Sequence, residues 1–325
     1  MISFHTTSGK GIFTTCLTEI LMKSNSNLIT VRRKRRVAWI VMSAIIMVSI
    51  LFMAGTIHGR FNFKYETVEI DYDSLPAILD GFTIIHVSDL HLNSFDRHKK
   101  RLKMVIDSIN SYNADIIVNT GDFVTILWDE MKPYMDILSE LKARYGVYAI
   151  PGNHDTGLYS GEYNQDNYHE HLKIIGDMLR YSGYIYLEDS SAFINIDTLT
   201  ISMTGVATYG RVPHLYYGNI EKARKDTEGG DFNILLTHDP NHWVKDVRYR
   251  HDINLTLSGH THGMQIGILL PGFKLSPASL LYPAWSGLYG KNNNYLYVNR
   301  GLGTIGMPAR IGMPPAITII KLKNH

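Results

Sequence analysis

Apolar positions after residue 81 recur at two spacings, one typical of buried strands and the other of amphipathic helices. Unbroken apolar runs predict strands in the first half of this region, at 82–87, 116–118 and 146–150. Apolar residues three or four positions apart predict helices that alternate with these strands, at 102–109, 134–141 and 172–179. This alternation predicts an α/β domain with buried strands.

The second half of the region is richer in strands. Apolar or alternating runs predict them at 194–196, 199–206, 232–236, 253–257, 264–270, 295–298 and 316–322. No internal repeat, low-complexity tract or Pro- or Ser-rich linker divides the region. The sequence therefore predicts one folded domain over residues 59–325, with its first packed residues near position 67.

A separate apolar run near the N-terminus predicts a membrane span. Residues 37–57 carry no charge and approach the ~20 residues that are needed to cross a bilayer. The basic run 32–36 precedes them, and the positive-inside rule places that run in the cytoplasm. We expect a disordered, basic cytoplasmic tail over 1–36 and a single-pass helix over 37–58 in the inner (plasma) membrane. The folded domain would then be extracytoplasmic.

Three alternatives compete with this reading of the N-terminus. A cleaved signal peptide fits less well, because the apolar run exceeds a typical signal core and no A-x-A-like cleavage site follows it. A twin-arginine export signal lacks a matching sequence after its arginine pair. Translation from Met22 would still leave a complete membrane-targeting segment, so the start at Met1 or Met22 is open.

Charge and cysteine content exclude several classes of function. The formal net charge is only +2, and the basic residues gather in the N-terminal run and not along a folded face, so no nucleic-acid partner is predicted. Cys16 is the only cysteine. The chain therefore has neither an internal disulfide nor a cysteine-based metal site.

Short polar clusters follow five of the predicted strands, where open α/β sheets bind their ligands. In chain order they are Asp89 with His91, Asp122, Asn153 with His154 and Asp155, His238, and His260 with His262. Alternation along an extended backbone would aim Asp89 and His91 to the same side. Oxygen and imidazole ligands without thiolates suit manganese, iron or zinc, and argue against a structural zinc finger.

The ordered set D-x-H, G-D, G-N-H-D, H and G-H-x-H resembles the calcineurin-like metallophosphoesterase superfamily, in particular its small membrane-anchored bacterial members. The resemblance covers residues 80–325 and implies a four-layer α/β/β/α sandwich. It also implies two divalent metal ions (Mn, Zn or Fe). One ion would be held by Asp89, His91 and His262, and the other by Asn153, His238 and His260, with Asp122 bridging the two.

The resemblance implies a metal-dependent phosphoric ester hydrolase, acting on phosphate mono- or diesters as a phosphatase or phosphodiesterase. A metal-bridged hydroxide would attack phosphorus while His154 protonates the leaving oxygen and Asp155 orients the His154 ring. Two cations solve the charge problem of this reaction, since they neutralise phosphoryl oxygens and lower the pKa of a shared water. The expected partners are a phosphate-ester substrate, lipid-linked or derived from the cell envelope, and membrane lipid around the anchor.

Two other functions remain as alternatives. A UDP-diacylglucosamine pyrophosphate hydrolase of lipid A synthesis would act at the cytosolic face, which the predicted topology opposes. A non-catalytic metal-bound scaffold would have little reason to keep His154 together with every ligand.

Other polar and aromatic residues have weaker support. His86 lies inside the first predicted strand and is expected to be a hydrogen-bonded core residue. Tyr159 and Tyr163 either line a substrate cleft or only shape their loop. Arg300 and Arg310 either contact an anionic substrate or form surface salt bridges. Solvated or local roles are expected for His98, His169, His171, His242 and His251.

Overall fold

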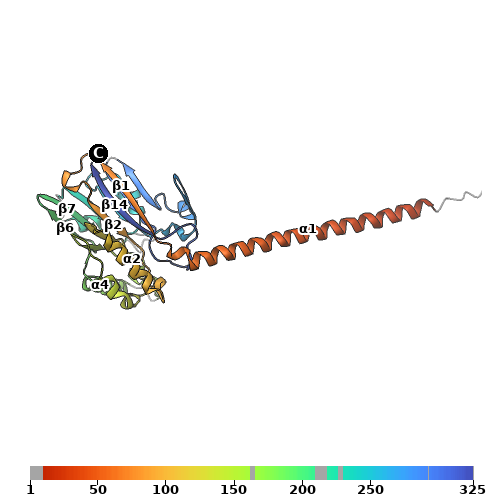
Figure 1. The fold of residues 1–325 in the computed structure, drawn as a ribbon, viewed down its shortest axis with the longest axis horizontal. Coiled ribbons are helices and arrows are strands. Elements are labelled where there is room, and N and C mark those ends of the chain that lie inside the picture. The colour runs from red at the N-terminus through yellow and green to blue at the C-terminus, as the bar shows by residue number, and fades with distance from the viewer. Residues whose placement is uncertain (1–9, 162–164, 209–217, 226–229, 292, 325) are drawn as a thin grey trace, which may run out of the picture. The chain divides into compact units, whose positions relative to one another are not determined.

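The computed structural model describes residues 10–161, 165–208, 218–225, 230–291 and 293–324 (Figure 1). The chain forms two compact units, residues 1–53 and residues 54–325. Each unit is described by itself.

The first unit contains most of helix α1, which runs from Lys10 to Ile57. The helix lies where a span was expected, and residues 31–61 are long and apolar enough to cross a membrane. Residues 10–36 are helical as well, which differs from the disordered tail that the sequence predicted. Extending an existing helix forms one hydrogen bond per added residue, whereas starting a helix is unfavourable, so the apolar segment favours helix in the residues before it.

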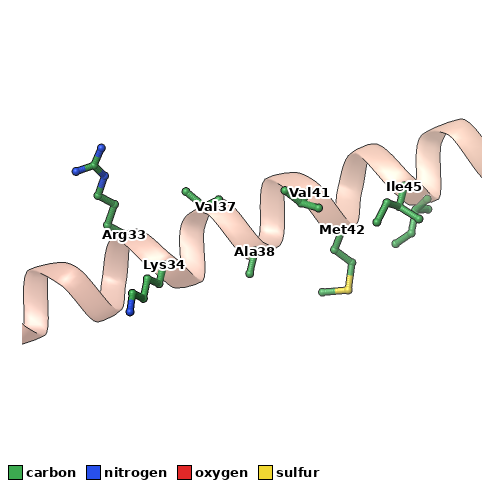
Figure 2. A pocket seen from close by; sticks show the side chains of 8 residues that line it. Arg33, Lys34, Val37, Ala38, Val41, Met42 and Ile45 are labelled. Carbon is green, nitrogen blue, oxygen red and sulfur yellow. The ribbon is translucent and has the colours of Figure 1, made fainter.

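Figure 2 shows the start of the apolar segment on α1. Arg33 and Lys34 are followed by Val37, Val41 and Met42. The hollow that these side chains line is the surface of a single helix and carries no catalytic group. From Val37 onward these side chains are apolar and exposed.

The second unit contains two six-stranded mixed sheets. The first has the strand order β1-β14-β2-β3-β4-β5. Its strands are β1 (Lys64–Tyr72), β2 (Thr83–Val87), β3 (Ile116–Asn119), β4 (Val147–Ala149), β5 (Tyr184–Tyr186) and β14 (Ala316–Asn324). All neighbours in this sheet are parallel except β14 and β2.

The second sheet has the strand order β12-β13-β9-β8-β7-β6. Its strands are β6 (Ser190–Ile196), β7 (Leu199–Gly205), β8 (Phe232–Leu236), β9 (Leu255–Ser258), β12 (Gly287–Lys291) and β13 (Asn294–Val298). The inner neighbours are parallel, and the edge strands β12 and β6 pair antiparallel. A separate hairpin joins β10 (Ile268–Leu270) to β11 (Phe273–Leu275).

The side chains of β2 show how the layers are stacked. Ile84 belongs to the apolar core between the sheets, together with Ile234 and Leu255 of the second sheet. The next residue, Ile85, points the other way and packs with the helices on the outer face. These are α2 (Lys99–Ser111), α3 (Met135–Leu138) and α4 (Gln165–Tyr181), of which α2 and α4 are labelled in Figure 1.

The outer face of the second sheet is covered in the same way. Leu235 and Val298 pack against α5 (Ile220–Arg224) and the π-helical turn Trp243–Val247. The predicted four-layer α/β/β/α sandwich is therefore confirmed. Short 3₁₀ turns complete the described elements, at Gly59–Phe61, Ala77–Leu79, Leu92–Phe95, Trp128–Tyr134, His154–Thr156, His262–Gln265 and Pro277–Leu280.

Two strands of the second unit differ from what the sequence predicted. The strand predicted at 264–270 is wrong in its first half, because Gly263 and Met264 have left-handed backbone angles and form a turn; strand β10 covers only Ile268–Leu270. Strand β1 was not predicted. Its charged and apolar residues alternate over Lys64–Tyr72, and it is placed by nine parallel Cα pairs with β14, which lies more than 250 positions away.

Candidate metal centre

All five polar clusters lie just beyond the carboxyl ends of parallel strands, three in the first sheet and two in the second. The strands are β2, β3 and β4 in the first sheet, and β8 and β9 in the second. Because the two sheets are stacked with a shared core, these strand ends meet at one edge of the sandwich. The predicted site residues are thereby brought together from distant segments; Asp89 and His262, for example, lie 173 positions apart in the sequence.

The side chains form two groups of three, and within each group the ligand atoms lie within 4.8 Å of one another. One group is Asp89, His91 and His262, and the other is Asp122, His238 and His260. In the first group, His262 Nε2 lies 3.3 Å from Asp89 Oδ1 and 3.1 Å from His91 Nε2. The first group has the three residues of one ligand set that the resemblance implied, and the second has His238 and His260 of the other set together with Asp122.

Asp122 faces both groups through one oxygen. Its Oδ2 lies 3.1 Å from His238 Nε2 and 3.7 Å from His91 Nε2. Its other oxygen, Oδ1, accepts a hydrogen bond of 2.8 Å from the backbone N–H of His154. That bond holds the carboxylate with Oδ2 turned toward His238 and His91.

Buried polar atoms without hydrogen bonds show that the site fits cations. Among the described residues, Asn153 Oδ1 and His238 Nε2 are buried and have no hydrogen-bond partner; the approach of His238 Nε2 to Asp122 lacks hydrogen-bond geometry. Unsatisfied buried atoms of this kind are costly unless another ligand completes them. A divalent cation bound by oxygen and nitrogen would satisfy both atoms.

The imidazoles are also oriented in the manner of metal ligands. His91 Nδ1 donates to the carbonyl of Val124 at 3.1 Å, and His238 Nδ1 donates to the carbonyl of Thr120 at 2.6 Å, which leaves Nε2 of each ring for a cation. His260 Nε2 instead lies 3.0 Å from the hydroxyl of Tyr282, which leaves its Nδ1. Backbone and hydroxyl partners thus fix the ring orientation at each position.

The backbone at the ligands is unusual. Five ligand residues have positive φ: Asp89 (50°), His91 (40°), Asp122 (57°), His260 (73°) and His262 (50°). Left-handed angles are uncommon for residues other than glycine, and they gather at functional sites where the surrounding structure holds them. The extended alternation expected at Asp89 and His91 is therefore wrong, although both side chains do reach the site.

Glycines beside the ligands leave room for this approach. A Cβ added to Gly152 would lie 2.1 Å from Asp122 Oδ1. One added to Gly259 would lie 1.9 Å from Ser88 Oγ and 2.4 Å from Asp89 Oδ2. No larger residue fits at either position without moving a carboxylate.

Asp155 has a different role from the one expected. Its carboxylate accepts four backbone N–H groups, from residues 122, 123, 124 and 152, at 2.8 to 3.1 Å, so it clamps the Asp122 loop and does not orient His154. The His154 ring is set by the Thr125 carbonyl, 2.7 Å from Nδ1. Tyr159 stacks on that ring with centroids 4.0 Å apart. Of the two tyrosines considered for a substrate cleft, Tyr159 therefore lies beside His154. Tyr163 lies outside the described residues.

Charges around the site favour the protonation state that cations require. Burial alone would raise the pKa of Asp89 and Asp122, but the imidazoles of His262 and His238 outweigh burial and hold both pKa values below their usual range. Burial lowers the pKa of His91 to about 3 and also lowers the pKa of His260. Ionised carboxylates and neutral imidazoles are the forms that bind metal.

His238 differs from these two imidazoles. Burial lowers its pKa, but the adjacent Asp122 carboxylate raises it to about 10. A cation that binds His238 would have to displace the proton on this ring. The affinity of the site for metal should therefore fall as the pH is lowered.

Arg300 and Arg310 do not form surface salt bridges. Both are buried; Arg300 pairs with Glu66. Arg310 donates to backbone carbonyls of residues 300, 301, 303 and 313 at 2.6 to 3.3 Å, and its Nη2 lies 3.3 Å from Nδ1 of His262. Arg310 therefore holds the segment beside one ligand of the first group.

Two histidines outside the groups of ligands can be compared with the surroundings that the sequence predicted for them. His86 is a buried core residue bonded to Thr120 Oγ1 at 2.9 Å, as expected. His242 is buried and lies 2.9 Å from Oγ1 of Thr237, five positions before it, so of the two roles expected for it the local one holds. Tyr282 was missed altogether, because nothing near position 282 in the sequence marks it as a neighbour of His260.

Comparisons with known proteins agree with this geometry. Residues 82–264 match the family described as calcineurin-like phosphoesterase. The chain is 33% identical over 267 residues to the uncharacterized metallophosphoesterase YkuE of Bacillus subtilis (strain 168), covering 80% of this chain and 86% of that protein. A Danio rerio protein named "Transmembrane protein with metallophosphoesterase domain" is 30% identical over 288 residues, which are 86% of this chain.

The chain spans 62% of the length of that Danio rerio relative. The solved structure of a phosphopantetheinyl hydrolase from Mycobacterium tuberculosis is 14% identical, with a TM-score of 0.39, and covers 61% of this chain and 89% of that one. The family match covers more than half of the chain and contains every candidate metal ligand. This chain belongs to the calcineurin-like phosphoesterase family.

Proposed function

We propose that this protein is a membrane-anchored phosphoesterase that uses two divalent cations, Mn, Zn or Fe, to hydrolyse phosphate mono- or diesters. When bound, the cations supply Lewis acidity, neutralise phosphoryl oxygens and lower the pKa of the attacking water. Asp89, His91 and His262 would hold one cation, and Asn153, His238 and His260 the other. Asp122 would bridge them.

The observation that carries this proposal is the position of Asp122 Oδ2 between the two groups of ligands. Its separations from His238 Nε2 and His91 Nε2, 3.1 and 3.7 Å, bring one negative oxygen to both groups at once. Two separate single-ion sites would not need a shared carboxylate. A shared carboxylate keeps two cations close together, which is the requirement for in-line displacement at phosphorus.

His154 is the proposed general acid. Its Nδ1 is bonded to the Thr125 carbonyl, which keeps a proton on Nδ1 in the neutral ring and leaves Nε2 to exchange a proton with substrate. Water would attack phosphorus and release a proton to solvent, the bond from phosphorus to the ester oxygen would break, and His154 Nε2–H would protonate the departing oxygen. His154 would then regain its proton from solvent. Such proton donation typically contributes ~10² to 10⁴-fold to the rate.

His154→Gln separates this catalytic role from metal binding. Turnover of a phosphodiester with an alkyl leaving group should fall by about 10²-fold or more, with metal content unchanged, because His154 is in neither group of ligands. An ester whose leaving group needs no proton should be affected much less. His98→Gln, on a partly exposed residue outside the site, is the matched control. Unchanged turnover in the His154 variant would remove it from the mechanism.

Anchoring and orientation are part of the same proposal. The helical segment over residues 31–61 supports a single membrane span, and the basic run 32–36 supports a cytoplasmic N-terminus with the catalytic domain on the extracytoplasmic side of the plasma membrane. The substrate would then be lipid-linked or derived from the cell envelope. No observation favours the UDP-diacylglucosamine hydrolase or the non-catalytic scaffold.

A reporter fused after residue 325 tests the orientation. Alkaline phosphatase should be active at that position and a cytoplasmic fluorescent reporter should not. Replacing the five basic residues 32–36 with glutamine should reduce this bias, since they are the positive side of the charge difference. A fluorescent, phosphatase-negative fusion of the unaltered chain would place the domain in the cytoplasm.

A further inference from the structure

Most apolar side chains of the hairpin β10–β11 face solvent and not the domain. Its outer face consists of Ile266, Ile268, Leu270, Phe273 and Leu275, which we call the apolar hairpin face. These side chains are 41 to 61% exposed. A hairpin on the surface of a soluble domain normally turns apolar residues inward and polar residues outward.

The strand pairing explains this reversal. Ile268 pairs with Leu275 and Leu270 pairs with Phe273, so these four side chains share one face. The remaining pair, Leu269 and Lys274, occupies the inner face.

The inner face of the hairpin is packed on the domain. Leu269 contacts the small core of Ala278, Trp285 and Met313. Lys274 directs its ammonium group to the Tyr289 hydroxyl, 2.8 Å away, and lies over the Trp285 ring. Lys274, the one charged residue of the hairpin, is exposed but lies on the face opposite the apolar hairpin face, which carries no charge.

The base of the hairpin lies beside the end of the apolar helical segment. The N–H of Gly267 donates to the Ile311 carbonyl at 2.9 Å, and the N–H of Arg310 donates to the Gly55 carbonyl at 3.2 Å. A Cβ on Gly59 would lie 2.1 Å from the Arg310 carbonyl oxygen. Residues 54–61, where the apolar segment ends, and the hairpin thus share one segment, 309–311, within the same compact unit.

The apolar hairpin face is also next to the metal centre. The chain passes from the ligand His262 through one turn into Ile266. On the other side of the hairpin, Leu280 is 85% exposed and lies two positions before Tyr282, whose hydroxyl contacts His260. A surface that meets the apolar hairpin face would therefore reach the edge of the site.

We propose that the apolar hairpin face, with Leu280, inserts into the boundary between lipid headgroups and acyl chains, and holds the metal centre beside phosphate esters of lipid headgroups. This inference rests on the proposed phosphoesterase function and its anchor. A bilayer is the occupant because the face is uncharged and exposed, and because its base shares the segment 309–311 with residues 54–61, where the apolar segment ends. Apolar side chains on such a projection partition into the interface without a protein partner.

Site-directed spin labelling of the full chain in vesicles tests the insertion without measuring activity. In a Cys16→Ser background, single labels at Leu270→Cys and Phe273→Cys are compared with Phe193→Cys, a 47% exposed aromatic residue on the edge strand β6. The vesicles contain phosphatidylcholine and phosphatidylglycerol. We expect the hairpin labels to be relaxed more by oxygen than by a water-soluble nickel chelate, and the Phe193 label to show the reverse.

Three outcomes would overturn the proposal. Hairpin labels as accessible to nickel as the Phe193 label would place the face in water. Spin–spin broadening that disappears on dilution with unlabelled chain would assign the face to a second copy. Protection from both reagents without broadening would mean that the chain itself covers the face.

Activity supplies the second arm. Leu270→Ser combined with Phe273→Ser should lower turnover of a phosphate ester presented on vesicles by at least about tenfold, because two apolar side chains lose their burial in lipid. Turnover of a soluble aryl ester should be unchanged, and equal loss on both substrates would contradict the proposal. If the unaltered chain hydrolyses neither ester while the labels still report insertion, the proposed phosphoesterase function is rejected. The proposal that the apolar hairpin face inserts into the membrane is then kept.

Discussion

The two sheets of the sandwich contribute different chemistry to the same site. The first sheet supplies both carboxylates, the amide of Asn153 and one imidazole, from the loops after β2, β3 and β4. The second sheet supplies three imidazoles, after β8 and β9. Both carboxylates thus come from one sheet, and most of the imidazoles come from the other.

The short contacts of the site join one sheet to the other. His262 Nε2 and Asp89 Oδ1 lie 3.3 Å apart, and His238 Nε2 and Asp122 Oδ2 lie 3.1 Å apart. Neither sheet alone holds a complete group of ligands. Metal binding should therefore depend on, and stabilise, the packing of the two sheets.

Asp122→Asn should have the largest effect, because it neutralises the one oxygen that faces both groups. We expect turnover of an aryl ester to fall at least about 10³-fold, equivalent to about 4 kcal/mol of transition-state stabilisation, with loss of bound metal. Asp80→Asn, on an exposed turn before β2, is the matched control and should change neither quantity. Full metal content together with full turnover in the Asp122 variant would contradict the bridge.

Removal of the cations should have the next largest effect. At a metal concentration of 100 times Kd, binding stabilises the folded chain by about 2.7 kcal/mol, so a chelator should lower the melting temperature measured by calorimetry. The reason is that Asp89 and Asp122 are fully buried carboxylates that cations would neutralise. The same chelator should shift the Asp122→Asn variant much less. Equal shifts would mean that the metal binds elsewhere.

Tyr282→Phe should have a moderate effect, confined to the second group. The change removes the hydroxyl 3.0 Å from His260 Nε2 and leaves the ring in place. Loss of such a partner typically weakens metal affinity by 10-fold or more, about 1.4 kcal/mol. Competition with a fluorescent chelator would measure it, with Tyr249→Phe, on a 69% exposed residue, as control. Equal weakening of both metal sites would show that the groups are not separate.

Asp252→Asn should have the smallest effect, since Asp252 lies before β9, at the edge opposite the ligands. Burial raises its pKa, but Arg250 and Arg224 outweigh burial and hold it at about 2. The folded pKa is below the unfolded one, so this stabilisation is present above pH ~4 and is lost as the pH falls through about 2. The side chain is 46% exposed, which leaves a few tenths of a kcal/mol. Urea unfolding at neutral pH would check this; a loss above about 2 kcal/mol would contradict it.

Much of the site was predictable because each ligand motif is local. Short motifs such as Gly152-Asn153-His154-Asp155 directly follow apolar runs, and a run of that type ends at the edge of a sheet where ligands bind. The alternation of strands and helices predicted an α/β domain, and the resemblance of the ordered motifs to the family implied its four layers. Both inferences need only neighbouring residues.

Long-range packing decided what the sequence did not show. Asp155 is adjacent to His154, yet its carboxylate bonds with N–H groups of the loop after β3. The left-handed backbone at Asp89 and His91 is held by hydrogen bonds from their N–H groups to the carbonyls of Gly121 and Asp122. Tyr282 contacts His260 only because the intervening hairpin folds back on the domain. No local pattern encodes such contacts.

Anomalous X-ray diffraction from crystals of the metal-loaded chain tests the central claim most directly. We predict two anomalous peaks about 3.5 to 4 Å apart, one on each side of Asp122 Oδ2. One should contact Asp89, His91 and His262, and the other Asn153, His238 and His260. A single peak, or two peaks that do not share Asp122, would contradict the account.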